Sequence, residues 1–295
     1  MKKDRNEPIG RCYGTFSGRH STMLSGPRIR MFSGRRHVGL AAAIALCMSL
    51  FGCRADTPQE PVDTPQKTKL LLYCGAGIRP AAAELAEEFG RQHDATVECD
   101  YAGSEVLISR IKLSKQGDLY MPGDVYYVEQ AEEEGLVTSK KTACYFVPVI
   151  LVKKGNPKNI RSLTDLARPG MKIGLGDPNA CAIGRKCSKI FAKNKISEED
   201  LNVAFRSLTV NELGNHVKLG MLDAAIVWDA VAAYFAGQAE VVPIPRDQNV
   251  ISTVAVGVLN CSEHPGLSGQ FVDFIASEQG KAIFQKHHFA TTLPE

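Results

Sequence analysis

The sequence predicts an α/β fold in which helices cover both faces of mainly parallel sheets, and three observations support this. From residue 69 onward, short apolar runs alternate with helix-forming segments, as expected for repeated βα units. This region holds roughly 227 residues, enough for one large or two modest lobes. Two longer apolar runs, 145–152 and 250–259, bracket the middle of the chain. Paired as crossing strands, they would join two lobes.

The first part of this region is expected to alternate strand and helix. Residues 69–74 (KLLLYC) form an apolar run typical of a strand buried on both faces. Pro80 suits the first turn of the helix that follows, and residues 96–101 alternate as a strand does. Ser104 stands at an N-cap position before the segment EVLISRIKLSK. The next helix is expected to begin at Asp124.

The second part continues the same alternation. Short runs rich in Val, Ile, Leu or aromatic residues predict strands at 145–152, 172–175, 223–228, 241–244 and 250–259. Helices are expected at 162–167, 183–193, from Glu198 onward, at 211–219 with Asn211 as the cap, and at 230–236, 265–276 and 278–287.

An export signal is predicted ahead of the folded region. Arg35 and Arg36 lead into the apolar run 38–50, which is followed by the small Gly52 and then Cys53. A basic start, an apolar core of about 7–15 residues and a small residue at the cut describe a secretory signal, and the cysteine directly after it resembles a bacterial lipobox. The run falls short of the about 20 apolar residues of a membrane span. We expect a lipid anchor on Cys53 in the periplasm or at the cell surface; an ordinary signal peptide or a short anchor helix is the alternative.

The segments around this signal differ in composition from the rest. Residues 1–30 are rich in Gly, Arg and Ser, and Met31 would begin a signal of normal length. The leader 1–52 therefore suggests a true start at Met31. Residues 53–68 are polar and Pro-rich, which is typical of an extended linker.

The positive charge is concentrated in the leader. Residues 1–52 hold nine Lys or Arg and two Asp or Glu, so the remainder has 26 basic and 30 acidic residues, although the whole chain carries +3. A mildly acidic folded region argues against nucleic acid as a partner.

The cysteine count suggests disulfides in an exported protein. Six cysteines follow the linker, an even number that allows fifteen pairings; buried free thiols are the alternative. If the two crossing strands are antiparallel, Cys144 would lie near Cys261. Cys74 ends the first predicted strand and Cys99 lies in the second, which could be its neighbour in the sheet. Cys181 and Cys187 lie on either side of a turn and the start of a helix. The expected pairs are Cys74–Cys99, Cys144–Cys261 and Cys181–Cys187.

No enzyme motif stands out, but small residues recur where a strand leads into a helix. The chain contains no P-loop, GxSxG or HExxH pattern. Residues 75–77, 103–104 and 180–184 are small-residue turns, each placed before a predicted helix. Such turns leave backbone N–H groups free at a helix N-terminus, where anions bind. Taken singly each turn is weak evidence, because Gly and Ser cap helices in many α/β proteins.

Four segments follow one another in an order that points to a family. Residues 72–88 (LYCGAGIRPAAAELAEE) give a strand, a small-residue turn and a helix, and residues 100–107 (DYAGSEVL) give a second turn. Residues 172–184 (KIGLGDPNACAIG) contain a strand, a GDP turn and a glycine, and residues 222–229 (LDAAIVWD) end a late strand in an aromatic residue. In this order they resemble the periplasmic molybdate-binding proteins of ABC importers, which are type II solute-binding proteins.

The resemblance implies a two-lobed periplasmic-binding-protein-like fold. Lobe 1 would comprise residues 69–144 plus 252–295, and lobe 2 residues 145–251. It also implies a binding protein and not an enzyme, acting as a monomer without a cofactor. Such a receptor would close by a hinge on a tetrahedral oxyanion, molybdate or tungstate, and deliver it to an ABC permease in the membrane.

Carried over by position, the resemblance also implies a ligand shell. It consists of backbone N–H groups and a few side-chain donors at Ala76, Gly77, Ser104, Ile183, Leu213 and Trp228, with Arg79 as a possible auxiliary. The family usually has a tyrosine where Trp228 stands; tryptophan keeps a donor in its indole N–H, and core packing is the alternative role. Related tungstate-binding proteins add carboxylates at positions that align with Cys181 and Val227. Their absence favours a four-coordinate oxyanion held by hydrogen bonds, with no free metal ion.

Two other functions are compatible with single residues of the sequence. A ferric or other cation receptor on the same fold would use oxygen ligands from Tyr126, Tyr127, Glu105 and Asp118. An exported phosphate-ester hydrolase would need Asp118, Asp124 and Asp177 to form one cluster.

Overall fold

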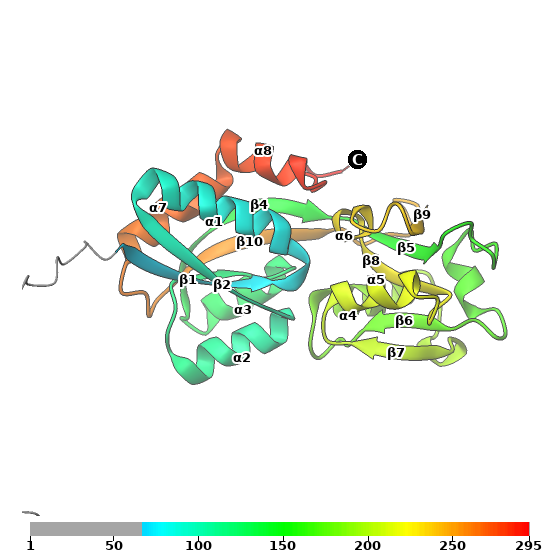
Figure 1. Ribbon diagram of the computed structural model, residues 1–295. Helices are drawn as coiled ribbons and strands as arrows, with labels where there is room; N and C mark the ends of the chain where they lie inside the picture. Colours follow the sequence, from blue (N-terminus) through cyan, green and yellow to red (C-terminus); the bar gives the residue numbers. More distant parts are fainter. Residues whose placement is uncertain (1–66, 295) are drawn as a thin grey trace, which may run out of the picture. The chain divides into compact units, whose positions relative to one another are not determined.

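The computed structural model describes residues 67–294, so the predictions for Met31, Cys53 and most of the linker lie outside the described residues. The described chain is organised around two five-stranded sheets (Figure 1). Within it, no helix has both the length and the apolar character needed to cross a membrane.

The first sheet defines what we call lobe 1. Its strands, in spatial order, are β2 (Ala95–Ala102), β1 (Thr68–Gly75), β3 (Leu119–Met121), β10 (Ser252–Leu259) and β4 (Val137–Phe146). β1 pairs in parallel with β2 and β3, while β10 runs antiparallel to β3 and β4. Five helices cover the sheet: α1 (Arg79–His93), α7 (Pro265–Ala276) and α8 (Glu278–Lys286) as one group, and α2 (Ser104–Ser114) with α3 (Val125–Glu133) as another (Figure 1).

The second sheet defines lobe 2 and repeats this design. Its strands, in spatial order, are β7 (Val203–Ser207), β6 (Ile173–Gly176), β8 (Ala224–Trp228), β5 (Pro148–Lys153) and β9 (Ala239–Pro243). β6 pairs in parallel with β7 and β8, and β5 is the antiparallel strand. The helices α4 (Ala182–Lys193), α5 (Val210–Lys218) and α6 (Asp229–Ala233) pack against it. The predicted fold class, two mainly parallel sheets flanked by helices, is confirmed.

The chain crosses between the lobes twice. It leaves lobe 1 at Val147, between β4 and β5, and returns through residues 244–251, between β9 and β10. Asn249 ties the two crossings together, because its side-chain amide donates to the carbonyl of Pro148 at 2.8 Å. The predicted single strand 145–152 is therefore wrong: it is two strands of different sheets, separated at Val147.

Local signals located several helices correctly and shifted others. Pro80 lies in the first turn of α1, and the carboxylate of Asp124 caps α3 by accepting the N–H of Tyr126 at 3.1 Å. Gly103, not Ser104, is the N-cap residue of α2, and Thr209, not Asn211, is that of α5. The helix expected from Glu198 is one short 3-10 turn, η3 (Glu198–Asp200), after which the chain forms β7. Two other 3-10 turns are η1 (Ala76–Ile78) and η2 (Leu163–Ala167).

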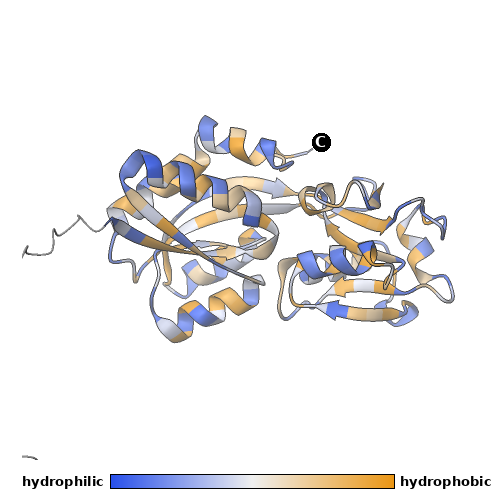
Figure 2. Cartoon of the chain, in the orientation of Figure 1, coloured by the Kyte–Doolittle hydropathy of each residue, from blue (hydrophilic) through white to orange (hydrophobic). Residues whose placement is uncertain are grey.

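Hydrophobic residues are frequent in the strands, whereas most helices contain both hydrophobic and hydrophilic stretches (Figure 2). The buried apolar residues of both lobes form one continuous cluster. Its largest fully buried members are aromatic: Tyr120, Tyr127, Phe89, Phe146, Phe191, Phe271 and Phe284.

The six cysteines of the described residues are free thiols, so none of the three predicted disulfides is formed. Cys144 pairs with Val254 in the β4–β10 register, and Cys261 lies seven residues farther along, about 23 Å at the rise of a strand. The two α-carbons of a disulfide usually lie within about 7 Å of each other. β4 and β10 are antiparallel, which is the condition on which this pair was expected, but their register excludes it.

Geometry also explains the other two unpaired sets. Cys99 lies opposite Leu72 in β1, two residues from Cys74, which gives a diagonal separation of about 8 Å. Cys181 is the N-cap residue of α4, and Cys187 lies six residues later, a rise of about 9 Å along the helix.

We expect a reducing agent to leave the melting temperature unchanged. Loss of a native disulfide typically costs about 2–5 kcal/mol, so a bridged protein would melt earlier when reduced. Calorimetric melting with and without reductant tests this, together with a thiol titration of the denatured protein. A drop in melting temperature, or fewer reactive thiols than cysteines, would contradict the free-thiol state.

Candidate functional site

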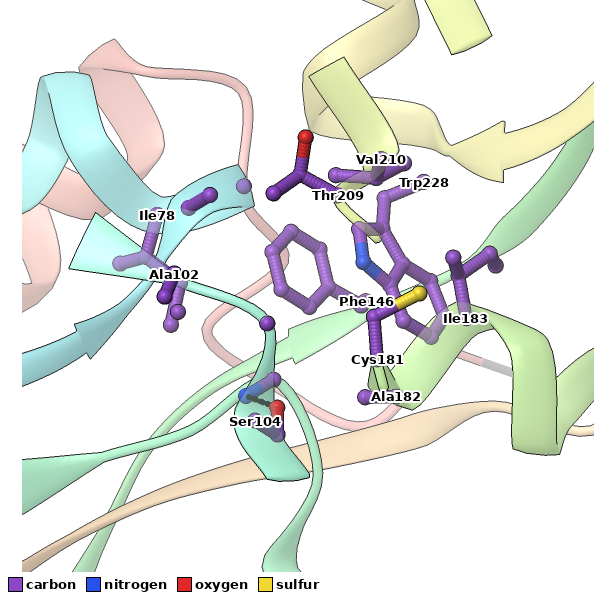
Figure 3. Close-up of a pocket in the computed structure, with 15 residues that line it drawn as sticks. Ile78, Ala102, Ser104, Phe146, Cys181, Ala182, Ile183, Thr209, Val210 and Trp228 are labelled. Atoms are coloured by element: carbon purple, nitrogen blue, oxygen red, sulfur yellow. Dashed lines mark hydrogen bonds between the residues drawn. The ribbon is translucent and has the colours of Figure 1, made fainter. Parts of the chain in front are cut away.

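A small cavity lies between the lobes, at the carboxyl ends of parallel strands from both sheets. β1, β2 and β8 end at residues of its lining, and β6 leads to the lining through the turn 177–180. Such strand ends are the usual ligand position in open α/β sheets. Lobe 1 contributes Gly75, Ala76, Gly77, Ile78, Ala102, Gly103, Ser104, Gly123 and Phe146; lobe 2 contributes Cys181, Ala182, Ile183, Thr209, Val210 and Trp228 (Figure 3).

The size of the cavity suits one compact ligand. The centre of a water-sized sphere can occupy about 20 Å³ of it. A sphere of that volume has a radius of about 1.7 Å, and adding the probe radius of about 1.4 Å gives a hollow of about 3.1 Å radius. The outer radius of a tetrahedral oxyanion is the length of its bond from the central atom to oxygen plus the radius of one oxygen atom. This radius is similar to that of the hollow.

Four helical N-termini open into this cavity. They belong to η1, which continues into α1, and to α2, α4 and α5. None of the four has a side-chain capping hydrogen bond, although α3 and α8 elsewhere in the protein are capped in this way. The first N–H groups of a helix have no partner within the helix. Donors from both lobes are therefore left for a ligand.

The hydroxyl of Ser104 is arranged as a further donor. Ser104 is 2% exposed, and its Oγ accepts the backbone N–H of Gly123 at 3.1 Å (Figure 3). A serine hydroxyl carries one hydrogen and two lone pairs. Because a lone pair takes the Gly123 bond, the hydrogen remains available to an acceptor in the cavity.

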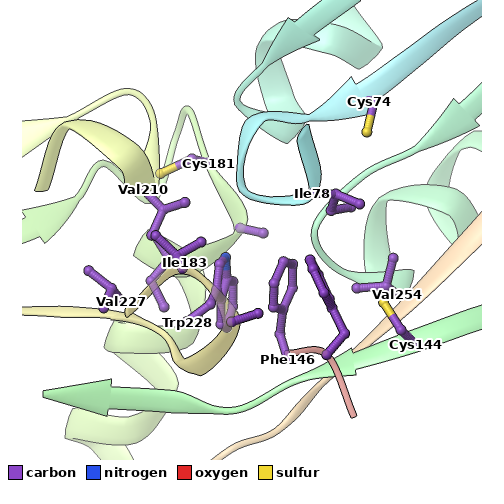
Figure 4. Close-up of a cluster of buried hydrophobic side chains, with 14 of the residues drawn as sticks. Cys74, Ile78, Cys144, Phe146, Cys181, Ile183, Val210, Val227, Trp228 and Val254 are labelled. Atoms are coloured by element: carbon purple, nitrogen blue, oxygen red, sulfur yellow. The ribbon is translucent and has the colours of Figure 1, made fainter. Parts of the chain in front are cut away.

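Trp228 forms the wall opposite the first turn. Its ring stacks on Phe146 with centroids 4.7 Å apart and an interplanar angle of 10°, so that one aromatic pair joins the two lobes (Figure 4). Its indole nitrogen lies on the ring edge turned toward the cavity (Figure 3). Trp228 therefore serves both of the roles considered from the sequence, core packing and cavity lining.

The cavity lining contains no ionisable side chain except a thiol. Burial raises the pKa of the Cys181 thiol to about 11, so this group is neutral at physiological pH. Three carboxylates directly follow lining residues in the sequence, Glu105, Asp124 and Asp229, and none of them is part of the lining. Asp229 directs its Oδ1 to the backbone N–H of Val147 at 3.1 Å. An anion in the cavity would meet neutral donors and no opposing negative charge from the lining.

The lobes touch at the rim of the cavity. The N–H of Glu105 in α2 donates to the carbonyl of Ala180 in lobe 2 at 3.1 Å. Gly103 lies so close that a Cβ on it would be 2.4 Å from the Ala180 carbonyl oxygen and 2.5 Å from that of Leu208. The two lobes are thus in direct contact beside the cavity.

The structure brings five of the six expected ligand residues together. Ala76, Gly77, Ser104, Ile183 and Trp228 line the cavity, whereas Leu213 does not. Because α5 begins at Val210, Leu213 lies a turn inside the helix, fully buried near Gly174 of β6. Arg79 is also outside the lining: its guanidinium stacks on the ring of Tyr101 at 4.1 Å.

Sequence reasoning missed several lining residues. Thr209 and Val210 begin α5 where Leu213 was expected. Gly123 follows β3, which was not predicted, and Phe146 lies in the predicted strand 145–152 but was not predicted to line a site. Thr209 could have been found from its place as a threonine ahead of a helical pattern. Phe146 carries no such signal, because its role depends on contact with the other lobe.

The oxygen ligands considered for a cation lie outside the lining. Tyr127 is fully buried, and burial raises the pKa of its hydroxyl, which disfavours the tyrosinate that iron would need. Tyr126 packs under the guanidinium of Arg185 at 3.7 Å. Asp118 accepts the N–H of Leu71 at 2.8 Å within lobe 1.

The three aspartates of the hydrolase alternative do not form one cluster. Asp118 lies beside β1, Asp124 caps α3, and the carboxylate of Asp177 accepts the N–H of Asn179 at 2.8 Å in the turn before α4. In the described part of the chain, no group of three or more His, Cys, Asp or Glu side chains is placed to hold a metal ion.

Residues 70–290 match a family of known proteins, the bacterial extracellular solute-binding proteins. The chain belongs to this family. Among the relatives of this solute-binding protein is the molybdate-binding protein ModA of Mycobacterium tuberculosis. It is 26% identical over 262 residues, which cover 86% of this chain and 99% of that protein.

Solved structures with the same fold are named for different solutes. The sulfate-binding protein SubI of Mycobacterium tuberculosis superimposes with a TM-score of 0.68 and 21% identity, covering 77% of this chain and 88% of that one. Iron-bound HitA of Pseudomonas aeruginosa gives a TM-score of 0.61 and 17% identity, covering 74% and 84%. These similarities establish the two-lobed fold of this solute-binding protein, and the cargo has to be inferred from its own cavity.

Proposed function

We propose that this solute-binding protein captures a tetrahedral oxyanion, molybdate or tungstate, by closing its two lobes around it. The observation that carries the proposal is the convergence of four helical N-termini, none capped by a side chain, on one cavity without charged side chains. Helix N-termini attract anions through their free N–H groups and their dipoles.

The electrostatics match a doubly negative ligand. Each helix N-terminus is equivalent to about half a positive elementary charge, so four of them together balance a dianion. The Ser104 hydroxyl and the Trp228 indole N–H add two directional donors from opposite lobes. The same donors would repel a cation, which argues against the ferric alternative.

The choice among oxyanions rests on size and on the relatives. ModA of Mycobacterium tuberculosis, which is named for molybdate, matches this chain over 99% of ModA's own length. The hollow of about 3.1 Å radius suits a tetrahedral anion. Molybdate and tungstate have nearly the same size and charge, so we expect both to bind. Sulfate is smaller and should bind more weakly.

The remaining parts of the proposal concern delivery. The signal at 38–53 would export the chain, and lipid on Cys53 would hold it at the membrane as a monomer beside an ABC permease. Hinge motion would occur at Val147 and at residues 244–251, where the chain crosses between the lobes. We assign it no catalytic role.

Isothermal titration calorimetry tests the proposal directly. Residues 61–295 form one unit and can be titrated with molybdate, tungstate, sulfate, phosphate and ferric citrate. Tight binding of the first two, with much weaker or no binding of the others, is the expected result. A preference for ferric citrate or phosphate would reject the assignment.

Replacing Ser104 by Ala should weaken oxyanion binding by about tenfold or more, because a hydrogen bond to a charged group is worth about 1.5–3 kcal/mol. The measurement is the calorimetric Kd for molybdate. Ser109→Ala is a matched control, since Ser109 is exposed on the same helix. Equal Kd values for Ser104→Ala and the unmodified protein would remove the hydroxyl from the ligand shell.

A further inference from the structure

A single ion pair joins the two lobes. The Nζ of Lys186, on α4 of lobe 2, lies 2.6 Å from Oδ2 of Asp124, the N-cap residue of α3 in lobe 1. The two side chains are only 9% and 7% exposed. Every other ion pair between residues 67 and 294 stays within one lobe and has a partner that is more than 30% exposed.

The Asp124 carboxylate is fixed within lobe 1, whereas the Lys186 ammonium has its second partner in the returning crossing. The Asp124 carboxylate accepts the N–H of Tyr126 and the hydroxyl of Ser252, both in lobe 1. Among the described residues, the Lys186 ammonium also donates to the carbonyl of Ile251, 3.3 Å away in the returning crossing. A displacement of α4 relative to α3 would therefore separate the two charges, while the Asp124 carboxylate keeps its partners in lobe 1.

The ion pair lies directly beside the cavity. Gly123, which precedes Asp124, lines the cavity, and so do Ala182 and Ile183, about one turn before Lys186 on α4. A Cβ placed on Gly123 would be 3.2 Å from the Cβ of Ala182. The spacing of α3 and α4 that brings the charges together is thus also the width of the cavity on this side.

Burial makes the pairing sensitive to this spacing. A desolvated charge without its partner is strongly unfavourable, whereas a well-placed pair, or two neutral side chains of similar volume, is tolerated. If the lobes closed to another angle, both charges would lose water without gaining each other.

We propose that Asp124 and Lys186 are positioning residues that fix the angle at which the lobes close, and thereby the size of the oxyanion that the cavity accepts. This role deepens the proposed function and rests on it. The guanidinium of Arg185, 3.7 Å from the ring of Tyr126 across the same interface, supports the same angle at its exposed edge.

The chain offers a built-in probe for the test, because Trp228 is its only tryptophan and lines the cavity. Stopped-flow fluorescence of the full chain with molybdate and sulfate would be measured for Asp124→Asn, Lys186→Met and the double variant. Lys189→Met and Asp247→Asn make the same changes at exposed positions and serve as controls.

Each single variant should release molybdate at least about tenfold faster, because truncating one partner of a buried pair acts mainly on dissociation. The double variant should dissociate more slowly than either single one. Its preference for molybdate over sulfate should fall at least about fivefold, since the angle is no longer fixed. Additive single effects, or an unchanged preference in the double variant, would overturn the role.

A measurement without ligand separates this role from the proposed function. Acrylamide should quench Trp228 more in either single variant than in the unmodified or double-variant protein, with circular dichroism confirming an intact fold. If the unmodified protein bound none of the oxyanions, the proposed function would fail and this comparison would decide alone. Equal acrylamide quenching of Trp228 in all four proteins would reject the positioning role. If the single variants unfold, the double variant decides: quenching above that of the unmodified protein would likewise reject the role.

Discussion

Replacing Gly103 by Ala should abolish tight oxyanion binding while leaving the fold intact. A Cβ at this position would lie 2.4 Å and 2.5 Å from the carbonyl oxygens of Ala180 and Leu208. Both are backbone atoms of lobe 2, so neither can rotate away as a side chain would. The lobes could then not close fully, and the donors of lobe 2 would be withdrawn from the ligand.

The expected loss is large because several bonds are affected at once. Losing two hydrogen bonds to a charged ligand, at about 1.5–3 kcal/mol each, weakens binding by about 100-fold or more. Lobe 1 itself should tolerate the change, since Gly103 has φ −68° and ψ 151°, an ordinary conformation for alanine. The melting temperature without ligand should therefore be nearly unchanged.

Calorimetric titration with molybdate and a thermal melt of the same sample provide the two readouts. Gly269→Ala is the matched control, because a Cβ there meets no atom within 4 Å. Full affinity in Gly103→Ala would mean that binding does not require the lobe contact at this residue. A collapse of the melting temperature would place the clash within lobe 1 instead.

Much of the fold could be predicted from the sequence because its signals are local. The apolar run at β1, the proline that opens α1 and the final helices α7 and α8 each depend on neighbouring residues only. β3, β7 and most of β4 were missed. β3 has three residues and β7 has five, one of them the charged Arg206. The segment of β4 contains two adjacent lysines and becomes a strand through its pairing with β10.

The candidate site was predicted to the extent that it is made of turns. The small residues before α1, α2 and α4 could be recognised, because a ligand that approaches the backbone requires them. Leu213 was carried over by position from the resemblance, but α5 begins at Val210, so Leu213 lies inside the helix and outside the cavity lining. Phe146 was not found because its neighbour Trp228 belongs to another lobe and lies far away in the sequence.

The disulfide prediction failed for a related reason. The number of cysteines and their approximate positions follow from the sequence, but a disulfide needs α-carbons within about 7 Å. The β4–β10 register places Cys144 and Cys261 farther apart than this, and the six residues between Cys181 and Cys187 do the same along α4. Neither separation can be read from the amino-acid composition. Register depends on which face of a strand is buried against its partners.

Replacing Trp228 by Ala should cause the largest loss of stability of any change at the cavity. The side chain is 2% exposed and stacks on Phe146 between the lobes. Truncating a buried tryptophan costs about 3–5 kcal/mol, which corresponds to a decrease of about 6–20 °C in melting temperature for a protein of this size. Differential scanning calorimetry without ligand measures it.

Trp228→Phe separates the two roles of this residue. Phenylalanine keeps an aromatic ring against Phe146, so the stability loss should stay within about 1.5 kcal/mol. The indole N–H is lost, so molybdate affinity should fall by about tenfold, the value of one hydrogen bond to an anion. If Trp228→Phe bound molybdate as tightly as the unmodified protein, the indole would act in packing alone. Lobe 2 would then bind the anion only through the backbone N–H groups and the helix dipoles at the starts of α4 and α5.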